Sequence, residues 1–195
     1  MTRDAATSVP IHPLLAARWS PRALDPAGQV TDQQLRAVLE AARWAPSNGN
    51  TQPARYLVGR RGDDTYERLF ALLSHRNQGW AHPAAALVMA CAVTVNEKGP
   101  IPMAEYGVGL AAENLVLQAV AEGLVAHQMA GVDKESAKTV FSLPADVEPQ
   151  AVIALGVLGD PSRLDEDRRA KETAPRRRLA LEEIAFTGEW GTPAF

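Results

Sequence analysis

Residues 84–95 read AAALVMACAVTV, a continuous apolar run without a charged side chain. A strand covered on only one face alternates polar and apolar residues, whereas a strand covered on both faces reads as an unbroken apolar run. The run therefore predicts a fully buried central strand. Cys91, the one cysteine of the chain, lies inside it and is expected to be an inert buried thiol.

The stretch Ile101–Gly123, which follows the strand, has the longest helical pattern of the chain. It is apolar nearly all round, and its polar side chains are few: Glu105, Glu113, Asn114, Gln118 and Glu122. A helix of this kind is buried against more than one neighbour. Small residues, Gly107 and Gly109 among them, would let another backbone approach it closely.

The remaining segments mix helices and strands without strict alternation. Thr31-Asp32-Gln33-Gln34 resembles a capping box that opens a helix. We expect helices at 12–18, 31–45, 63–73 and 133–141 and strands at 55–59, 124–129 and 151–158. The charged segment at 162–178 is expected to be loop-like or to hold a helical turn. An α+β fold with a mixed sheet fits this order better than a Rossmann fold, because no Gly-x-Gly-x-x-Gly follows a strand.

Composition narrows the function classes. The chain has 195 residues, 46% hydrophobic and 22% charged, which suits one domain. A net charge of −3 argues against a general nucleic-acid binder. The lone cysteine rules out a disulfide framework, and the histidines show no metal spacing. No signal peptide and no apolar stretch of ~18 residues is found, so we expect a cytoplasmic protein without a membrane partner.

Two arginine clusters are candidate anion sites. Arg18-Trp19-Ser20-Pro21-Arg22 places two guanidiniums and a hydroxyl where a helix breaks. Guanidiniums bind phosphate through paired hydrogen bonds. The alternative is a pair of solvated surface arginines. Arg176-Arg177-Arg178 is open to the same two interpretations, an anion site or a solvated charge run.

Three further segments carry candidate ligand groups. Pro46–Pro53 reads PSNGNTQP, and its amides suit a ligand with mixed hydrogen-bonding edges such as a flavin, although the same residues also form ordinary turns. His127–Asp133 ends a predicted strand with Ala130 and Gly131, whose backbone N–H groups could bind flavin N5 or O4. Asn77–Trp80 is another candidate.

Taken together, these pieces resemble the nitroreductase family of FMN-dependent oxidoreductases. The match runs over about residues 12–190 and rests on motifs in the family's order: Arg18-x-Ser20-x-Arg22, Ala42–Pro53, Asn77 with Trp80, Asn114-Leu115-x-Leu117-Gln118-Ala119, Gly123-Leu124 leading into Met129–Asp133, and the basic cluster before Leu181-Glu182-Glu183-Ile184.

The resemblance implies the following site. Arg18 would bind the FMN phosphate, Arg22 would approach the flavin N1/O2 edge, and Arg176 and Arg178 would complete the phosphate clamp. Ser47, Asn48 and Asn50 would reach the flavin of the other subunit. Asn77 would hydrogen-bond the ring, with Ala130 and Gly131 beside N5. The expected cofactor-binding set is Arg18, Trp19, Ser20, Arg22, Pro46, Ser47, Asn48, Asn50, Gln52, Asn77, Met129, Ala130, Gly131, Arg176 and Arg178, with no metal ligand and no catalytic side chain.

The family's architecture supplies the expected fold. It is a three-layer sandwich in which helices flank a central mixed, mainly antiparallel sheet, assembled as an intertwined homodimer with an exchanged C-terminal arm. One domain would span 1–195, with an N-terminal extension at 1–11 and the arm at 179–195. The arm carries Leu181, Ile184, Phe186 and Trp190 with few polar neighbours, so it must dock on something.

The implied reaction is ping-pong hydride transfer from NAD(P)H through flavin N5 to a nitroaromatic, a quinone or a similar electron-poor acceptor. Trp19 stands where the family often has a basic residue, Ala130 stands where some members have an acid, and only 96–100 joins the buried strand to the long helix. The short connection suggests an open substrate face. The alternatives are an FMN protein with a divergent reaction (flavin breakdown, dehalogenation or dehydrogenation) and a non-catalytic flavin-binding dimer.

Overall fold

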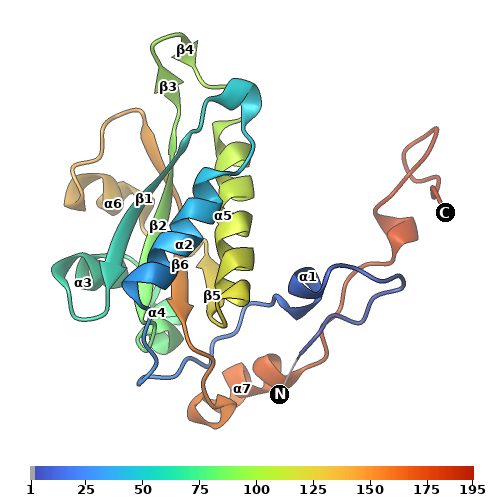
Figure 1. Ribbon diagram of the computed structural model, residues 1–195, viewed down its shortest axis with the longest axis horizontal. Helices are drawn as coiled ribbons and strands as arrows, with labels where there is room; N and C mark the ends of the chain where they lie inside the picture. The colour runs from blue at the N-terminus through green and yellow to red at the C-terminus, as the bar shows by residue number, and fades with distance from the viewer. Residues whose placement is uncertain (1–2) are drawn as a thin grey trace.

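The computed structural model describes residues 3–195, and its central part is a three-layer sandwich (Figure 1). A four-stranded sheet in the order β1-β2-β6-β5 forms the middle layer. Its strands are β1 (Ala54–Arg60), β2 (Ala86–Val93), β5 (Val125–Met129) and β6 (Val147–Gly156). Helices α2 (Asp32–Arg43) and α5 (Ala104–Ala121) cover one face, and α3 (Asp64–Ala71), α4 (His75–Ala81) and α6 (Lys134–Val140) cover the other.

Strand β2 is the central strand that its sequence predicts. Because successive side chains of a strand point to opposite faces, Ala86 and Val88 pack with α2 and α5, whereas Leu87 and Met89 pack with α3 and α4. Cys91 lies on the second face, and burial raises the pKa of its thiol to about 11. The thiol therefore stays protonated at neutral pH, as expected of an inert buried cysteine.

The predicted mainly antiparallel sheet is confirmed, whereas no parallel pair that would make the sheet mixed occurs within residues 3–195. All three strand pairings, β1 with β2, β2 with β6 and β5 with β6, are antiparallel. Strand β6 also begins at Val147, earlier than the predicted Ala151, and a register shift between Ala90 and Cys91 lets it continue past Pro149. Proline has no N–H to give to a ladder, so an irregularity in pairing is where a strand tolerates it.

Local capping explains where the helices begin. The hydroxyl of Thr31 accepts a hydrogen bond from the Gln34 N–H while the Gln34 side chain accepts one from the Thr31 N–H, which confirms the predicted capping box of α2. The carboxylates of Asp63 and Asp133 cap α3 and α6 by accepting from the N–H groups of Tyr66 and Ser136, without the reciprocal bond of a capping box. Each cap depends on residues within one turn, which is why the sequence could predict the capping box of α2.

Helix α5 is buried on several sides, as its all-round apolar pattern predicts. It packs against α2 and the sheet through Ala111, Leu115 and Ala119. A Cβ atom on Gly107 would stand 3.0 Å from Cγ of Pro53. Gly107 thus allows the Pro46–Pro53 loop to lie directly on the helix.

Three connecting segments differ from the sequence-based expectation. Helix α4 was not predicted. The 96–100 connection is a hairpin of β3 (Val95–Asn96) and β4 (Gly99–Pro100). The 162–178 segment contains α7 (Glu166–Thr173) rather than a loop or a single helical turn, and short 3₁₀ turns occupy Asn48–Asn50, Pro161–Arg163 and Leu181–Glu183.

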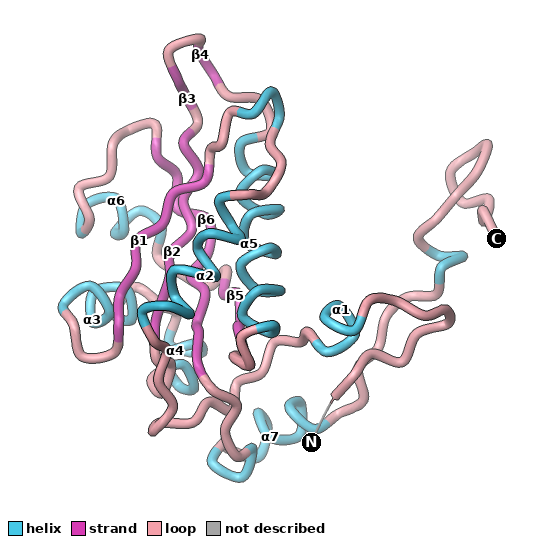
Figure 2. The backbone as a smooth tube through the Cα atoms, in the orientation of Figure 1, coloured by secondary structure: helices cyan, strands magenta, loops and turns pink. Residues whose placement is uncertain are grey.

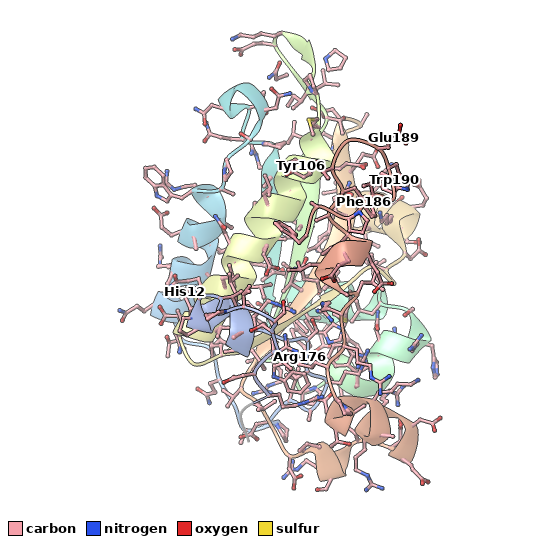
Figure 3. The ribbon with its side chains drawn as sticks, turned by 90° about the vertical axis from the view of Figure 1, so that its right-hand side faces the viewer. His12, Tyr106, Arg176, Phe186, Glu189 and Trp190 are labelled. Atoms are coloured by element: carbon pink, nitrogen blue, oxygen red, sulfur yellow. The ribbon has the colours of Figure 1, made fainter. Side chains whose placement is uncertain are left out.

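The two ends of the chain lie beside the sandwich and are mostly irregular (Figure 2). The N-terminal segment with α1 (Pro13–Ala17) runs next to the C-terminal arm, which ends away from the body (Figure 1). Phe186 and Trp190 pack on each other near the end of the arm, with ring centroids 4.9 Å apart (Figure 3). Four large apolar side chains of this end of the chain are 59–92% exposed: Leu179, Ile184, Trp190 and Phe195.

None of the helices within residues 3–195 combines the length and the apolar character needed to cross a membrane.

Candidate functional site

The two arginine clusters of the sequence meet at one pocket of about 220 Å³. Its lining comes from the Arg18–Arg22 segment on one side and from α7 and the start of the arm on the other. The lining residues are Arg3, Arg18, Trp19, Ser20, Arg22, Lys171, Glu172, Ala174, Pro175, Arg176 and Arg178. We call this the basic pocket. Arg18 and Arg178 are far apart in the sequence, yet both line this pocket, so the two clusters form a single site.

The backbone that carries Arg18 and Arg22 is held by side chains from three distant elements. Glu172 of α7 accepts hydrogen bonds from the N–H groups of Arg22 (2.9 and 3.1 Å) and Ala23 (3.0 Å). Glu172 is 2% exposed, the one charged side chain among the buried residues of the described chain. Both carboxylate oxygens thus accept from backbone donors, which compensates a charge that would otherwise be costly to bury.

Arg176 is the second holding group. Its guanidinium donates to the carbonyl oxygens of Arg3 (2.6 Å), Ala16 (2.8 Å) and Arg18 (2.8 Å). Burial lowers the pKa of Arg176 below its usual value, and the nearby charges of Arg18 and Arg178 lower it further. Arg176 therefore holds the backbone of the site together, and a phosphate contact would have to use its remaining N–H donors.

His127 of β5 is the third holding group. Its Nδ1 lies 2.9 Å from the carbonyl oxygen of Pro21, and its ring centroid lies 4.5 Å from that of Trp80. A carbonyl oxygen only accepts, so Nδ1 carries the hydrogen. Burial lowers the pKa of His127 to about 4, and the nearby cations Arg22 and Arg18 add to this shift. The imidazole is neutral at pH 7 and braces the loop without adding to its charge.

This placement predicts an acid-sensitive fold. In the unfolded chain His127 takes up a proton below pH ~6.5, whereas the folded chain resists protonation down to about pH 4. The unfolded state therefore binds more protons in this window, and stability falls as the pH falls through it. We expect about 2 kcal/mol of lost unfolding free energy at pH 5 relative to pH 7, measured by urea denaturation.

The matched variant is His127→Phe, which keeps an aromatic ring against Trp80 and cannot titrate. It should be less stable at pH 7, because the Pro21 carbonyl loses its donor, yet flatter between pH 7 and pH 5. An identical pH dependence in both proteins would contradict the assignment to His127.

Arg18 and Arg178 make fewer hydrogen bonds within the described residues than Arg176 does. Arg18 donates to the Ser20 hydroxyl at 3.4 Å and lies 3.7 Å from the carboxylate of Glu113 on α5. Arg178 donates to the carbonyl of the adjacent Arg177 at 2.8 Å and is exposed. Both guanidiniums keep N–H groups available to an anion in the pocket.

Asn77 and Gly131 form a second group of predicted residues at the end of β5. The side-chain amide of Asn77 donates to the Gly131 carbonyl at 3.2 Å. A Cβ on Gly131 would stand 2.8 Å from the Ser74 hydroxyl and 3.0 Å from Asn77 Nδ2, so a larger residue there would displace these two side chains. Ala130 and Gly131 are exposed, whereas Met129 is 2% exposed and could offer a ligand only its backbone.

The Pro46–Pro53 loop forms a third group. Gly49, Asn50 and Gln52 all have positive φ, an arrangement that tertiary contacts must enforce. The Ser47 hydroxyl contributes by accepting a hydrogen bond from the Gln52 N–H at 2.9 Å. Asn48 and Asn50 point their amides to solvent as exposed residues.

The chain does not bring this loop to the basic pocket. The loop lies at the N-terminal end of α5, whereas α1 and α7 lie toward the opposite end (Figure 1). Pro46, Ser47 and Gln52 instead line a separate, mostly apolar pocket of about 330 Å³ together with Tyr56. Burial raises the pKa of the Tyr56 hydroxyl to about 12, and within the described residues that hydroxyl has no hydrogen-bond partner.

No sign of a role for Glu172 was visible in the sequence, which placed His127 only at the start of the candidate segment His127–Asp133, without the contact to Pro21. Glu172 stands in the charged stretch EDRRAKET, where nothing distinguishes a buried carboxylate from a solvated one. His127 follows apolar residues in a strand, so its only signal was its nearness to Met129. Within residues 3–195 no group of three or more His, Cys, Asp and Glu side chains is placed to hold a metal ion.

Comparison with known proteins points in one direction. The model of the nitroreductase family matches residues 15–74 and 64–157. An uncharacterized 15.4 kDa protein of Mycolicibacterium smegmatis is 42% identical over 147 residues, which cover 71% of this chain and 99% of that protein. A crystal structure described as an oxidoreductase containing FMN has a TM-score of 0.91 and 30% identity, covering 97% of this chain and 98% of that one. A Desulfovibrio desulfuricans protein in complex with FMN has a TM-score of 0.69 and 27% identity, covering 92% and 100%.

Proposed function

This chain belongs to the nitroreductase family, and from that premise we propose that it is an FMN-dependent oxidoreductase that works as a homodimer. The basic pocket carries the proposal. It collects Arg18, Ser20, Arg22 and Arg178 around a space of about 220 Å³, which suits a phosphate group.

The chemistry of the donors fits that phosphate. Glu172 is the single carboxylate in the lining of the basic pocket. It accepts three backbone hydrogen bonds and forms no ion pair with the arginines of the pocket. The arginines therefore leave the pocket with a strong positive excess. A bound phosphate dianion would neutralise part of that excess while accepting several charge-assisted hydrogen bonds.

FMN, when bound, supplies hydride transfer between NAD(P)H and an electron-poor acceptor such as a nitroaromatic or a quinone. The chain's own contribution is binding and electrostatics. Arg22, fixed through its backbone by Glu172, would place a cation near the ring and stabilise negative charge on it. Asn77 and Gly131 would hold the ring edge. His127 is neutral and bonded to Pro21, so we assign it no proton transfer.

The homodimer follows from the separation of the groups. Asn48 and Asn50 are exposed and are not part of the lining of the basic pocket of their own chain, so we propose that they serve the cofactor of the partner subunit. Tyr106 on α5 is 61% exposed, and the arm adds further apolar surface, as Figure 3 shows for Phe186 and Trp190. A second subunit would cover these side chains and accept the exchanged arm.

The absorption spectrum tests the proposal directly. We expect the purified protein to be yellow, or to become yellow on reconstitution with FMN, and its visible absorbance to bleach when NADH or NADPH is added anaerobically. Absorbance should return when a quinone or a nitroaromatic is supplied. A colourless protein that cannot be reconstituted with FMN contradicts the proposal.

A second function keeps the cofactor and changes the reaction to flavin breakdown, dehalogenation or dehydrogenation. The observation that favours it is the short β3–β4 hairpin between β2 and α5, which leaves this side of the sandwich without a larger covering segment. Anaerobic stopped-flow measurements separate the two functions. Negligible flavin reduction at millimolar NADPH favours the second, and rapid reduction excludes it.

A further inference from the structure

Arg3 reaches the basic pocket from the N-terminal segment, outside both arginine clusters of the sequence. Its guanidinium carbon lies 4.4 Å from the ring centroid of Trp19, within cation–π range. Both side chains line the basic pocket beside Arg18 and Arg178. Neither Arg3 nor its contact with Trp19 is required by the motifs that predicted the site.

The N-terminal segment is held in this position by its backbone. The Arg3 carbonyl accepts a hydrogen bond from Arg176 at 2.6 Å, and the Ala5 N–H donates to the Ala16 carbonyl at 2.9 Å. The Arg3 guanidinium also donates to the carbonyl of Ala174. Arg3 is therefore half-buried and tied to α1 and to the end of α7, and it is not a solvated terminal side chain.

We propose that Arg3, supported on the face of Trp19, is a further phosphate ligand of this site and favours phosphorylated flavin over the unphosphorylated form. This inference rests on the proposed function, since it assigns a ligand to the same pocket. The indole ring orients the planar guanidinium and limits its rotation, so less entropy is lost when an anion binds.

Charge supports a phosphate monoester as the ligand group. Arg176 is largely occupied by the carbonyls of Arg3, Ala16 and Arg18, so it has fewer donors left for the phosphate. Arg3 lies on the same side of the pocket and supplies a charge with further N–H groups. A dianion gains more from this added cation than a neutral ligand does, which is why the effect should separate FMN from riboflavin.

The test is a titration of the full-length apoprotein with FMN and with riboflavin, followed by flavin fluorescence. We expect Arg3→Ala to weaken FMN binding about tenfold to a hundredfold, the range of one charge-assisted hydrogen bond. Riboflavin affinity should not change, because it has no phosphate. Trp19→Leu should weaken FMN in the same direction, and Trp19→Phe, which keeps an aromatic face, should restore most of the affinity.

The matched control is Arg169→Ala, which removes the same charge from exposed surface of α7 outside the pocket. It should leave both affinities unchanged. The inference is overturned if Arg3→Ala leaves FMN affinity intact, if it weakens FMN and riboflavin equally, or if Arg169→Ala has the same effect. A wild-type protein that binds neither flavin overturns the proposed function itself, which distinguishes the two failures.

Discussion

Replacing both Arg18 and Arg178 by alanine is expected to weaken FMN binding by a hundredfold or more. Both guanidiniums line the basic pocket and keep donors free for an anion. Charge-assisted hydrogen bonds contribute roughly 1.5–3 kcal/mol each, so the loss of two spans several powers of ten in the dissociation constant at its upper end. Isothermal titration calorimetry of the apoprotein with FMN measures the effect.

The fold should survive this double substitution. Within the described residues Arg18 forms one ion pair, with Glu113 at 3.7 Å, and their side chains are 19% and 44% exposed. A long, partly exposed pair of this kind contributes about 0–1 kcal/mol to stability. A variant with Arg163→Ala and Arg169→Ala loses the same charge outside the pocket and should bind FMN normally. Unchanged FMN affinity in the Arg18 and Arg178 variant would mean that the phosphate lies elsewhere.

The second large effect is expected from Glu172→Ala. This change leaves the N–H groups of Arg22 and Ala23 without their acceptor in a buried place. Each unsatisfied buried donor costs about 1–3 kcal/mol, so we expect a loss of about 2–6 kcal/mol in the free energy of unfolding. Guanidinium chloride denaturation, with the shift in midpoint at unchanged slope, measures the loss.

Glu172→Gln separates the role of the oxygen from the role of the charge. Its amide oxygen can still accept from Arg22 and Ala23, but its NH₂ group would face the Arg22 N–H where Oε2 now accepts at 3.1 Å. We expect an intermediate loss of stability together with weaker FMN binding, because the Arg22 backbone must move. If alanine at position 172 costs less than 1 kcal/mol and leaves FMN affinity unchanged, Glu172 does not hold the loop.

Both predictions depend on the Arg18–Ala23 segment, and this segment shows how far sequence reasoning reaches. The guanidiniums and the helix break were visible in the sequence, and in the structure Arg18 and Arg22 line one pocket with Arg176 and Arg178. The holding contacts from Glu172 and His127 were not visible. They join positions 106 to 150 residues apart, and no local pattern encodes such a pairing.

Arg176 is a second case in which the sequence does not predict the role of a side chain. The sequence presents three consecutive arginines that are chemically alike. Their roles diverge because the backbone carbonyls of Ala16 and Arg18 lie within reach of Arg176 alone, while Arg178 stays exposed. The geometry around each side chain therefore decides which arginine holds the backbone and which keeps its N–H donors exposed.

The sequence by itself determined the elements of the sandwich. The unbroken apolar run of β2, the all-round apolar pattern of α5 and the capping box at Thr31 were readable because each depends on residues close together in the chain. Tertiary structure alone decided the all-antiparallel pairing of the strands, the helical form of α7 with its buried Glu172, and the meeting of Arg3 with Trp19. These features arise when distant segments pack together, since only then do burial and unpaired backbone groups select one arrangement among many.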